Sequence, residues 1–336
     1  MDFTLPPPLE DVRLRTRRFV EDHILPLEAD PASYDAHENI EPAVLSRVQA
    51  KAKAAGLWSP QVPPSHGGMG LPMVGQAAMY EEANRSIFGP VCFNAAAPDD
   101  GNMRLLSQVA TPEQKERWLD PIASGAVRSA FVMTEPHPGG GSDPGMIRTK
   151  AERRGDRWII SGTKWFITGA GVASHFILMA RTSDDPRRGL TAFLFHKDQS
   201  GWEIVRRIPI MGPEEHGGDC GLKDRESVQI KLGQVAAAIE IGRLLVMKAA
   251  WKLDAGDFAR KEVSMAKNHV ADALHLAVDT AIQLCGAKGY SKDTPLEWIY
   301  RYARQARLVD GASEVHSMVL ANFYQKEGDA FWSWGV

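Results

Sequence analysis

The chain lacks the features of a membrane, secreted or nucleic-acid-binding protein. None of its apolar runs approaches the ~20 residues that span a bilayer. No basic region followed by an apolar core opens the sequence, so we expect no secretory signal. The three cysteines are an odd number and lie far apart, which implies no disulfide framework and favours a reducing compartment. A formal net charge of −3 argues against bulk electrostatic binding of nucleic acid or acidic lipid. We expect a cytoplasmic protein without a membrane span or a nucleic-acid partner.

Residues 1–128 have the pattern of a helical domain. Apolar residues three and four positions apart predict helices over 9–29, 43–56, 73–87 and 101–110. Thr111, Pro112 and Gln114 have the order of a capping box with proline in the first turn, which predicts a further helix start. The loop at 63–72 is rich in glycine, but no strand leads into it, so we do not interpret it as a dinucleotide-binding loop.

Residues 129–218 have the pattern of a β domain. Short segments rich in β-branched or aromatic residues predict strands at 158–160, 165–167, 176–179 and 190–195, with turn residues between them. No helical pattern separates these strands, so a parallel βαβ sheet is disfavoured. An antiparallel β-barrel or sandwich is expected instead.

Residues 219–336 return to a helical pattern. An apolar seam from Val235 to Leu253 predicts a helix that packs on another helix. Further helices are expected over 257–284, 295–308 and 313–324, with a glycine-containing break at 285–293. The predicted fold class is therefore α+β and multidomain: an all-α N-terminal domain, a middle β domain and a C-terminal up-down helical bundle.

The most informative segment is 131–143. It joins an apolar run to Thr134-Glu135-Pro136 and then to a glycine triplet closed by Ser142-Asp143. Glycines adopt positive φ and allow a bulky ligand to approach the backbone. A run of backbone N–H groups suits an anionic pyrophosphate or the edge of a flavin. Taken alone, the triplet is more often an ordinary turn.

Together with three later motifs, this segment resembles the flavin-contacting signature of the acyl-CoA dehydrogenases. Residues 164–169 resemble the family strand whose aromatic residue packs on the flavin and whose threonine hydrogen-bonds its edge. Residues 283–290 resemble a Gln-x-x-Gly-Gly-x-Gly turn that holds the FAD of a neighbouring subunit, with Ala287 in place of a glycine. Residues 307–316 resemble the segment whose acidic residue is the catalytic base, and aspartate before Gly-x-x-Glu-Val-His is similar to the 10/11-like branch.

Each later motif also has a simpler interpretation. Residues 164–169 could be a half-buried strand, and Gly286 could simply end a helix. Asp310-Gly311 could be a turn followed by an N-cap at Ser313. Four motifs in the family's order are a far stronger signal than any one of them.

The resemblance implies FAD as the cofactor and Asp310 as the catalytic base. It implies cofactor contacts from Phe131, Met133, Thr134, Gly141, Ser142, Phe166, Ile167, Thr168, Gln283, Gly286, Ala287, Gly289, Ala312 and Glu314. It implies substrate contacts from Ser142 and Gly311. No metal is expected, because His216 and Cys220 supply only two ligands.

The implied reaction is α,β-dehydrogenation of an acyl-CoA thioester to a trans-2-enoyl-CoA, within fatty acid metabolism. Asp310 would remove the α-proton while hydride passes to flavin N5, and the Asp310 backbone N–H would stabilise the thioester oxygen. Expected partners are the acyl-CoA substrate, an electron-transfer flavoprotein as electron acceptor, and further copies of the chain in a homodimer or homotetramer. Alternatives are another flavoenzyme on this scaffold, either an acyl-CoA oxidase or a flavin monooxygenase, or a non-catalytic remnant with impaired FAD binding.

The sequence departs from the family pattern near residue 220. Residues 210–220 lead directly into 222–229, where the family has the rest of the β domain, the first long bundle helix and an Arg-x-x-Phe-Gly turn. We therefore expect a truncated β domain at 129–218 and a bundle at 219–336 that is short of about one helix. Such a truncation leaves an open sheet edge and an apolar helix face without its usual partner.

Overall fold

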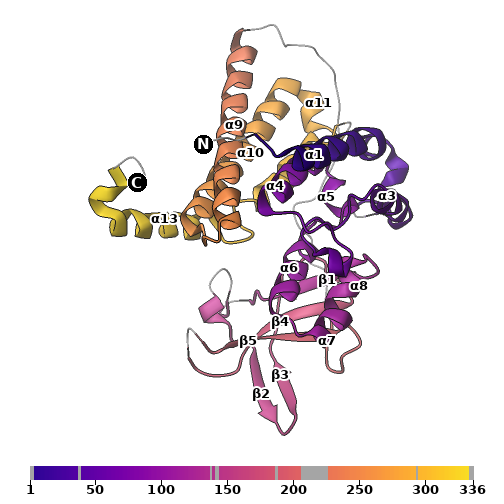
Figure 1. Ribbon diagram of the computed structural model, residues 1–336, viewed down its shortest axis with the longest axis vertical. Coiled ribbons are helices and arrows are strands. Elements are labelled where there is room, and N and C mark those ends of the chain that lie inside the picture. Colours follow the sequence, from indigo (N-terminus) through magenta and orange to yellow (C-terminus); the bar gives the residue numbers. More distant parts are fainter. Residues whose placement is uncertain are drawn as a thin grey trace. The chain divides into compact units, whose positions relative to one another are not determined.

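The computed structural model describes residues 4–36, 39–136, 138–140, 144–185, 188–205, 226–292 and 294–332. The chain divides into two compact units: the first is Leu5–Ile208, and the second is Pro209–Val336 together with Met1–Thr4. The order of helices, then strands, then helices that the sequence predicts is confirmed along the chain (Figure 1).

The first unit begins with helices, most of which lie where the sequence predicts them. They are α1 (Pro7–Phe19), α2 (Leu25–Glu28), α3 (Pro42–Ala54), α4 (Met73–Ala83), α5 (Gly89–Cys92), α6 (Asp99–Val109), α7 (Pro112–Gln114) and α8 (Asp120–Ala123). Five-residue π-helical turns join α1 to α2 and α7 to α8. The predicted capping box is present: the Gln114 N–H donates to Thr111 Oγ1 over 3.3 Å, and the Thr111 N–H donates to Gln114 Oε1 over 2.9 Å.

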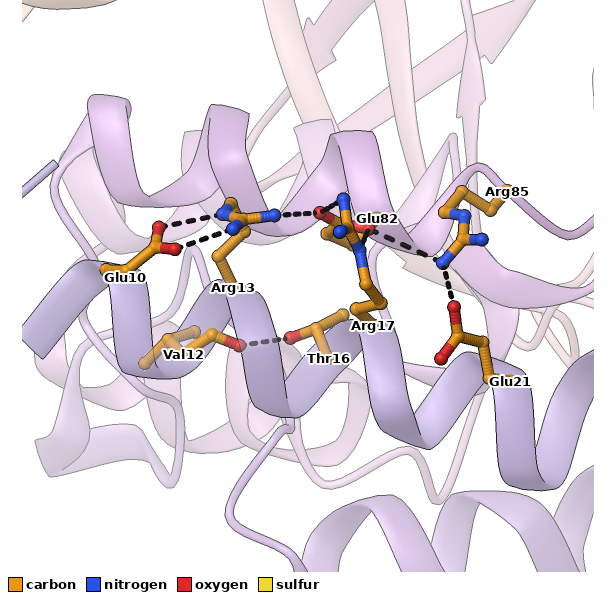
Figure 2. Close-up of polar contacts among 8 residues, drawn as sticks. All are labelled: Glu10, Val12, Arg13, Thr16, Arg17, Glu21, Glu82 and Arg85. Carbon is orange, nitrogen blue, oxygen red and sulfur yellow. Dashed lines mark hydrogen bonds and ion pairs between the residues drawn. The ribbon is translucent and has the colours of Figure 1, made fainter. Parts of the chain in front are cut away.

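A buried carboxylate joins the first and fourth helices. Glu82 on α4 is 2% exposed and accepts hydrogen bonds from Arg13 over 2.5 Å and from Arg17 over 2.8 and 2.9 Å, both on α1 (Figure 2). Burial raises the pKa of Glu82, but the two guanidinium groups outweigh it and hold that pKa below its usual value. Because an unpaired buried charge is costly, this network fixes how α1 lies on α4.

The middle of the chain forms a five-stranded sheet. Its strands are β1 (Ser129–Val132), β2 (Lys150–Arg154), β3 (Arg157–Ser161), β4 (His175–Arg181) and β5 (Leu190–His196). The order is β1-β4-β2-β3, with β5 also paired to β4. The β2–β3 and β4–β5 pairs are antiparallel, as expected, but β1 and β2 both pair with β4 in parallel, so the sheet is mixed. In the described part of the connection from β1 to β4, the regular elements are a 3₁₀ turn at Pro144–Met146 and the β2–β3 hairpin, with no α-helix.

Both faces of the sheet are covered at β1, and alternate side chains of β1 pack into two different apolar clusters. Ile177 and the partly buried Phe131 pack with Leu119 and other residues of α6–α8. Ala130 and Val132 point to the opposite face, where they pack with Phe176. This alternation is the period-2 pattern of a strand covered on both sides. Asp99 on α6 anchors the start of β1, since it accepts from Ser129 N over 2.7 Å and from Ser129 Oγ over 2.6 Å.

The second unit is helical. Its elements are α9 (Glu226–Asp254), α10 (Arg260–Cys285), α11 (Ala287–Tyr290), α12 (Leu296–Gln305) and α13 (Ser313–Glu327). The predicted seam of α9 does have a partner. Gly242 is buried against Val270 on α10, and His269 Nε2 lies 2.9 Å from the Ala238 carbonyl oxygen. Among the residues that the structure describes, no helix is both long enough and apolar enough to span a bilayer.

The elements that expose large apolar side chains include β3 and α9. On β3, Trp158, Ile159 and Ile160 are 36–45% exposed, although they lie on opposite faces of the strand. On α9 the exposed apolar residues are Ile230, Leu232, Ile239, Ile241, Leu244 and Trp251. Of these α9 residues, only Ile239 belongs to the predicted seam, whose members are Val235, Ile239, Gly242, Val246, Ala249 and Leu253.

Candidate functional site

The structure brings two of the predicted flavin-contacting segments together in the first unit. The first follows β1 at Met133 and Thr134, and the second begins at Lys164. The Trp165 N–H donates to the Thr134 carbonyl oxygen over 3.0 Å, and Lys164 Nζ donates to the Met133 carbonyl oxygen over 2.7 Å. Thr134 and Trp165 therefore lie side by side, although 31 positions separate them in the sequence.

A buried ion pair holds this junction. Glu135 is 4% exposed and accepts from Lys164 Nζ over 2.8 Å, from the Arg148 N–H over 2.7 Å and from the Thr149 N–H over 2.9 Å. Burial raises the pKa of Glu135, but the hydrogen bonds from Lys164 and the backbone outweigh it and lower the pKa to about 2. Burial also lowers the pKa of Lys164, against the attraction of Glu135. The pair therefore fixes geometry at a desolvation cost that its hydrogen bonds offset.

The glycine-rich loop turns back onto this pair. The Glu135 N–H donates to the Gly140 carbonyl oxygen over 2.7 Å, and the Gly139 N–H donates to the Pro136 carbonyl oxygen over 2.8 Å. A Cβ on Gly139 would lie 2.4 Å from Glu135 Oε2, so that position excludes a side chain. Gly141 and Ser142, predicted to contact cofactor and substrate, lie outside the described residues.

The second segment presents exposed aromatic rings. Trp165 is 39% exposed and Phe166 is 55% exposed, with ring centroids 5.0 Å apart. The strand predicted at 165–167 is wrong: Phe166 has φ of 49°, a left-handed conformation incompatible with a strand. Ile167 packs into the sheet core, while Thr168 is exposed in a turn. Strain of this kind at an exposed aromatic residue is typical of a ligand contact.

These features fit a flavin. Exposed aromatic rings offer a face to a planar ring system, and the neighbouring Thr134 and Thr168 hydroxyls can donate to or accept from its polar edge. Gly139, which has no room for a Cβ, lets the loop backbone stay close to Glu135 and therefore to this junction. The residues in place therefore match the requirements of the cofactor that the sequence implies.

In the second unit, the predicted glycine turn ends α10. Gln283 is exposed on the last turn of that helix, and Gly286 at its C-cap has φ of 57°. Gly289 is buried, and a Cβ there would lie 2.7 Å from the Ile282 carbonyl oxygen. Ala287 is the first residue of α11, where the family turn has a glycine.

The predicted base lies in a strained turn between α12 and α13. Asp310 has φ of 54° and Gly311 has φ of 89°, so two successive residues are left-handed. Asp310 and Glu314 are exposed, while Gly311 and Ala312 are partly buried. The N-cap of α13 is Ala312 and not the predicted Ser313. His316 Nε2 lies 3.1 Å from the Asp310 carbonyl oxygen, and His316 Nδ1 lies 3.1 Å from Ser264 Oγ on α10.

The two predicted sites of the second unit are far apart. Ser264, which contacts the residue holding the Asp310 turn, lies near the start of α10, and Gln283 lies near its end. Nineteen residues of α-helix separate them, which corresponds to about 28 Å. The expectation that the glycine turn serves a different FAD from the one beside Asp310 stays a prediction.

Sequence reasoning missed four residues that shape these sites: Glu135, Lys164, Ser264 and His316. Glu135, Lys164 and His316 lie inside the motifs described above. A charged or polar residue at a fixed position of a motif was therefore the signal that could have identified them. Among the described residues, no cluster of three or more His, Cys, Asp or Glu side chains could hold a metal, and His216 and Cys220 lie outside those residues.

A cavity of about 520 Å³ in the first unit contains none of the predicted site residues. It lies between α7, with the π-helical turn after it, and the β3–β5 side of the sheet, and aromatic side chains of both parts line it: Trp118, Trp158, Phe193 and Phe195. It marks incomplete packing on this side of the sheet rather than the chemistry that the motifs imply.

Comparison with known proteins gives matches along nearly the whole chain. Residues 7–126, 130–219 and 219–324 match the family models for the N-terminal, middle and C-terminal domains of acyl-CoA dehydrogenases. Acyl-CoA dehydrogenase family member 11 of Gallus gallus is 30% identical over 94% of this chain and 50% of its own length. The chain thus spans about half the length of the first curated relatives it matches.

Two mycobacterial proteins are also similar. FadE2 of Mycobacterium tuberculosis, assigned as an acyl-CoA dehydrogenase, is 29% identical over 96% of both chains. A solved structure from Mycobacterium abscessus, assigned to the same enzymes, has a TM-score of 0.88 and 28% identity over 97% of this chain and 100% of its own.

Proposed function

This chain belongs to the acyl-CoA dehydrogenase family, and we propose that it binds FAD and oxidises an acyl-CoA thioester to a trans-2-enoyl-CoA. The observation that carries the proposal is the junction of Thr134 with Trp165, where exposed rings and a strained Phe166 form a surface for a flavin. Phe131, Met133, Thr134, Phe166, Ile167 and Thr168 would hold the cofactor there. Gln283, Gly286 and Gly289 would contact the FAD of a second copy.

Asp310 is the base in this proposal. Its carboxylate stands in a turn whose left-handed backbone is strained, and strain of this kind is retained where a site needs it. Bound acyl chain and flavin would exclude water from the carboxylate, which strengthens it as a proton acceptor. The Asp310 N–H would donate to the thioester oxygen as charge develops on it, so one residue would remove the α-proton and stabilise the product of that removal. Bound FAD supplies the hydride acceptor.

We propose an electron-transfer flavoprotein as the electron acceptor and a homodimer or homotetramer as the assembly. The exposed apolar residues on α9 support association, because such a surface is unfavourable in water. The glycine turn supports it too, since a turn that serves another copy's cofactor requires that copy.

We also propose that the chain lacks a segment near residue 220. The alignment with the Gallus gallus relative runs over 392 positions, more than the 336 residues of this chain, so the relative carries residues without a counterpart here. The apolar side chains exposed on β3 and on α9 lie on opposite sides of that point in the sequence. Missing strands and a missing bundle helix would account for both, and for the cavity beside Trp158.

The test is flavin reduction by Asp310→Asn. The purified chain is first titrated with FAD, and the bleaching of the oxidised flavin band is then followed by stopped flow with acyl-CoAs of several lengths. We expect Asp310→Asn to bind FAD like wild type and to reduce it about 10²–10⁴-fold more slowly, because the amide cannot accept the proton. The matched control is Asp156→Asn in the β2–β3 turn, which should behave as wild type.

Three results would contradict the proposal. Absence of FAD binding at high micromolar concentration favours the remnant. Equal rates for wild type and Asp310→Asn remove Asp310 from the chemistry. Rapid reoxidation of the reduced flavin by oxygen assigns the chain to the oxidases or monooxygenases of this fold.

A further inference from the structure

The turn that carries Asp310 is held by a contact that the reaction itself does not use. His316 lies in the first turn of α13, and its ring bridges the Asp310 carbonyl and Ser264 on α10, with both distances 3.1 Å. Ser264 is 2% exposed, so the bridge is fixed at a buried point of the bundle.

The chemistry of the two partners assigns the hydrogens. A carbonyl oxygen only accepts, so Nε2 of His316 must carry the hydrogen that it donates to Asp310. In the neutral ring Nδ1 is then an acceptor, and the Ser264 hydroxyl donates to it. The Asp310 carbonyl thereby selects the tautomer, because a ring with its hydrogen on Nδ1 would present a lone pair to it, and Ser264 orients the ring by donating to Nδ1.

The neighbouring glycine makes this contact possible. A Cβ on Gly311 would lie 2.9 Å from His316 Nε2, so a side chain there would displace the ring. Gly311 also has φ of 89°, which disfavours other residues independently. The glycine therefore serves both the left-handed turn and the approach of the imidazole.

We propose that His316 is a positioning residue for the base, with Ser264 as the group that orients it. The inference rests on the proposed function of Asp310. By fixing the Asp310 carbonyl, the His316 N–H fixes the peptide plane between Asp310 and Gly311 and stabilises a φ that costs energy for a non-glycine residue. The direction of the carboxylate and of the Asp310 N–H follows from that backbone. Loss of the bridge would let the turn relax and move both groups away from the substrate.

The test compares His316→Leu, which cannot donate, with His316→Gln, whose amide N–H can replace the ring donor. His269→Leu is the matched control, because His269 also contacts a backbone carbonyl, that of Ala238 on α9, at 2.9 Å and lies outside the proposed site. All variants are loaded with FAD and titrated with acyl-CoA in the stopped-flow assay. Hydrogen exchange of the peptide covering 306–316 is measured without cofactor or substrate.

We expect His316→Leu to lower the limiting rate of flavin reduction about 10²-fold, the usual effect of misplacing a catalytic group by about 1 Å. FAD affinity should change much less than the limiting rate, since only Ala312 and Glu314 of the expected cofactor contacts lie in the turn that relaxes, and KM should also change less than the limiting rate. Hydrogen exchange at 306–316 should accelerate at least about tenfold, as expected for a local opening. His316→Gln should restore most of the rate, and Ser264→Ala should give an intermediate loss. His269→Leu should lower the melting temperature without changing the rate of the folded protein.

The outcomes separate this inference from the function beneath it. If His316→Leu reduces flavin at the wild-type rate while Asp310→Asn is inactive, only the positioning role of His316 is overturned. Unchanged hydrogen exchange at 306–316 would overturn that role too. A wild type that reduces no flavin, or an Asp310→Asn variant that reduces it normally, would remove the proposed function and the role of His316 in it together.

Discussion

The buried pair of Glu135 and Lys164 makes a prediction that depends on neither cofactor nor substrate. Lys164→Met removes the ammonium and keeps most of the side chain's volume. It leaves the Glu135 carboxylate 4% exposed, with the Arg148 and Thr149 N–H groups as its remaining donors in the described structure. The first unit should become much less stable, because burial of an uncompensated charge is costly.

Two routes give the magnitude. Breaking a buried ion pair by removing one partner costs about 3–5 kcal/mol. The pKa of Glu135 is lowered from 4.5 to about 2 by its hydrogen bonds, which corresponds to about 3 kcal/mol. We therefore expect Lys164→Met to lose about 3 kcal/mol at neutral pH. The double variant with Glu135→Gln should lose less than Lys164→Met alone, since a neutral amide is easier to bury than a charge.

The pH dependence has a definite sign. In wild type the lowered pKa of Glu135 gives stability that is complete above about pH 4.5 and is lost as the pH falls toward 2. In Lys164→Met burial is less opposed, so the carboxyl's pKa rises and the group takes up a proton at higher pH. The difference in stability between wild type and variant should therefore be largest near pH 7 and should shrink as the pH falls below the variant's raised pKa.

Urea denaturation at several pH values measures this, with tryptophan fluorescence as the probe, to which five of the nine tryptophans contribute from the first unit. Arg154→Met is the control: Arg154 pairs with Glu152 over 3.7 Å, with both side chains more than 60% exposed, and it should change stability by less than about 0.5 kcal/mol. A loss below about 1 kcal/mol for Lys164→Met, or the same loss at every pH, would refute the view that the pair holds the junction.

Three further predictions concern the first unit. Glu82→Gln should lose about 3 kcal/mol in urea denaturation at pH 7, because it removes the charge that Arg13 and Arg17 bind. The pKa of Glu82 is lowered in the folded protein, so the loss should begin to shrink below about pH 4.5 and continue to shrink as the pH falls through that lowered pKa; a loss that is the same at every pH would contradict this. Thr111→Ala should lower stability by about 1 kcal/mol through loss of the capping box, and an unchanged melting temperature would show that the cap is redundant. Gly139→Ala should weaken FAD binding in calorimetric titration at least about tenfold, because its Cβ would displace the Glu135 carboxylate, whereas Gly171→Ala, which meets no atom within 4 Å, should bind normally.

Local patterns in the sequence predict most of the helices but only part of the sheet. The 3.6-residue periodicity places α1, α3, α4 and α6 correctly, because each buries one face. The strand β2 escaped prediction because its sequence, Lys-Ala-Glu-Arg-Arg, is charged, with Ala151 alone buried. The false strand at 165–167 has strand-forming residues, but a left-handed Phe166 prevents pairing. Propensity was overridden there by the contacts around Lys164 and Trp165.

The candidate sites follow from motifs, while their geometry does not. Motif order predicts that 131–134 and 164–168 serve one ligand, but no periodicity predicts that the Trp165 N–H bonds to Thr134. The roles of Glu135 and Lys164 depend on their burial. Sequence reasoning does not predict that burial, because charged residues are usually exposed. The role of His316 depends on Ser264, 52 positions earlier in the sequence. Contacts of this range are set by packing of whole elements.

Each proposed site segment is anchored inside its own unit. In the first unit, the ion pair between Lys164 and Glu135 joins the two segments proposed to contact the flavin. In the second unit, His316 links the Asp310 turn to Ser264 on α10. Neither anchor uses a residue near position 220, where we propose that a segment is missing. Loss of that segment would therefore leave the local geometry of both halves intact and would weaken chiefly what the segment covered: the sheet beside Trp158 and the apolar face of α9. A chain of this kind keeps its chemistry only if association with another copy covers those surfaces, so flavin content and oligomeric state should rise and fall together with protein concentration.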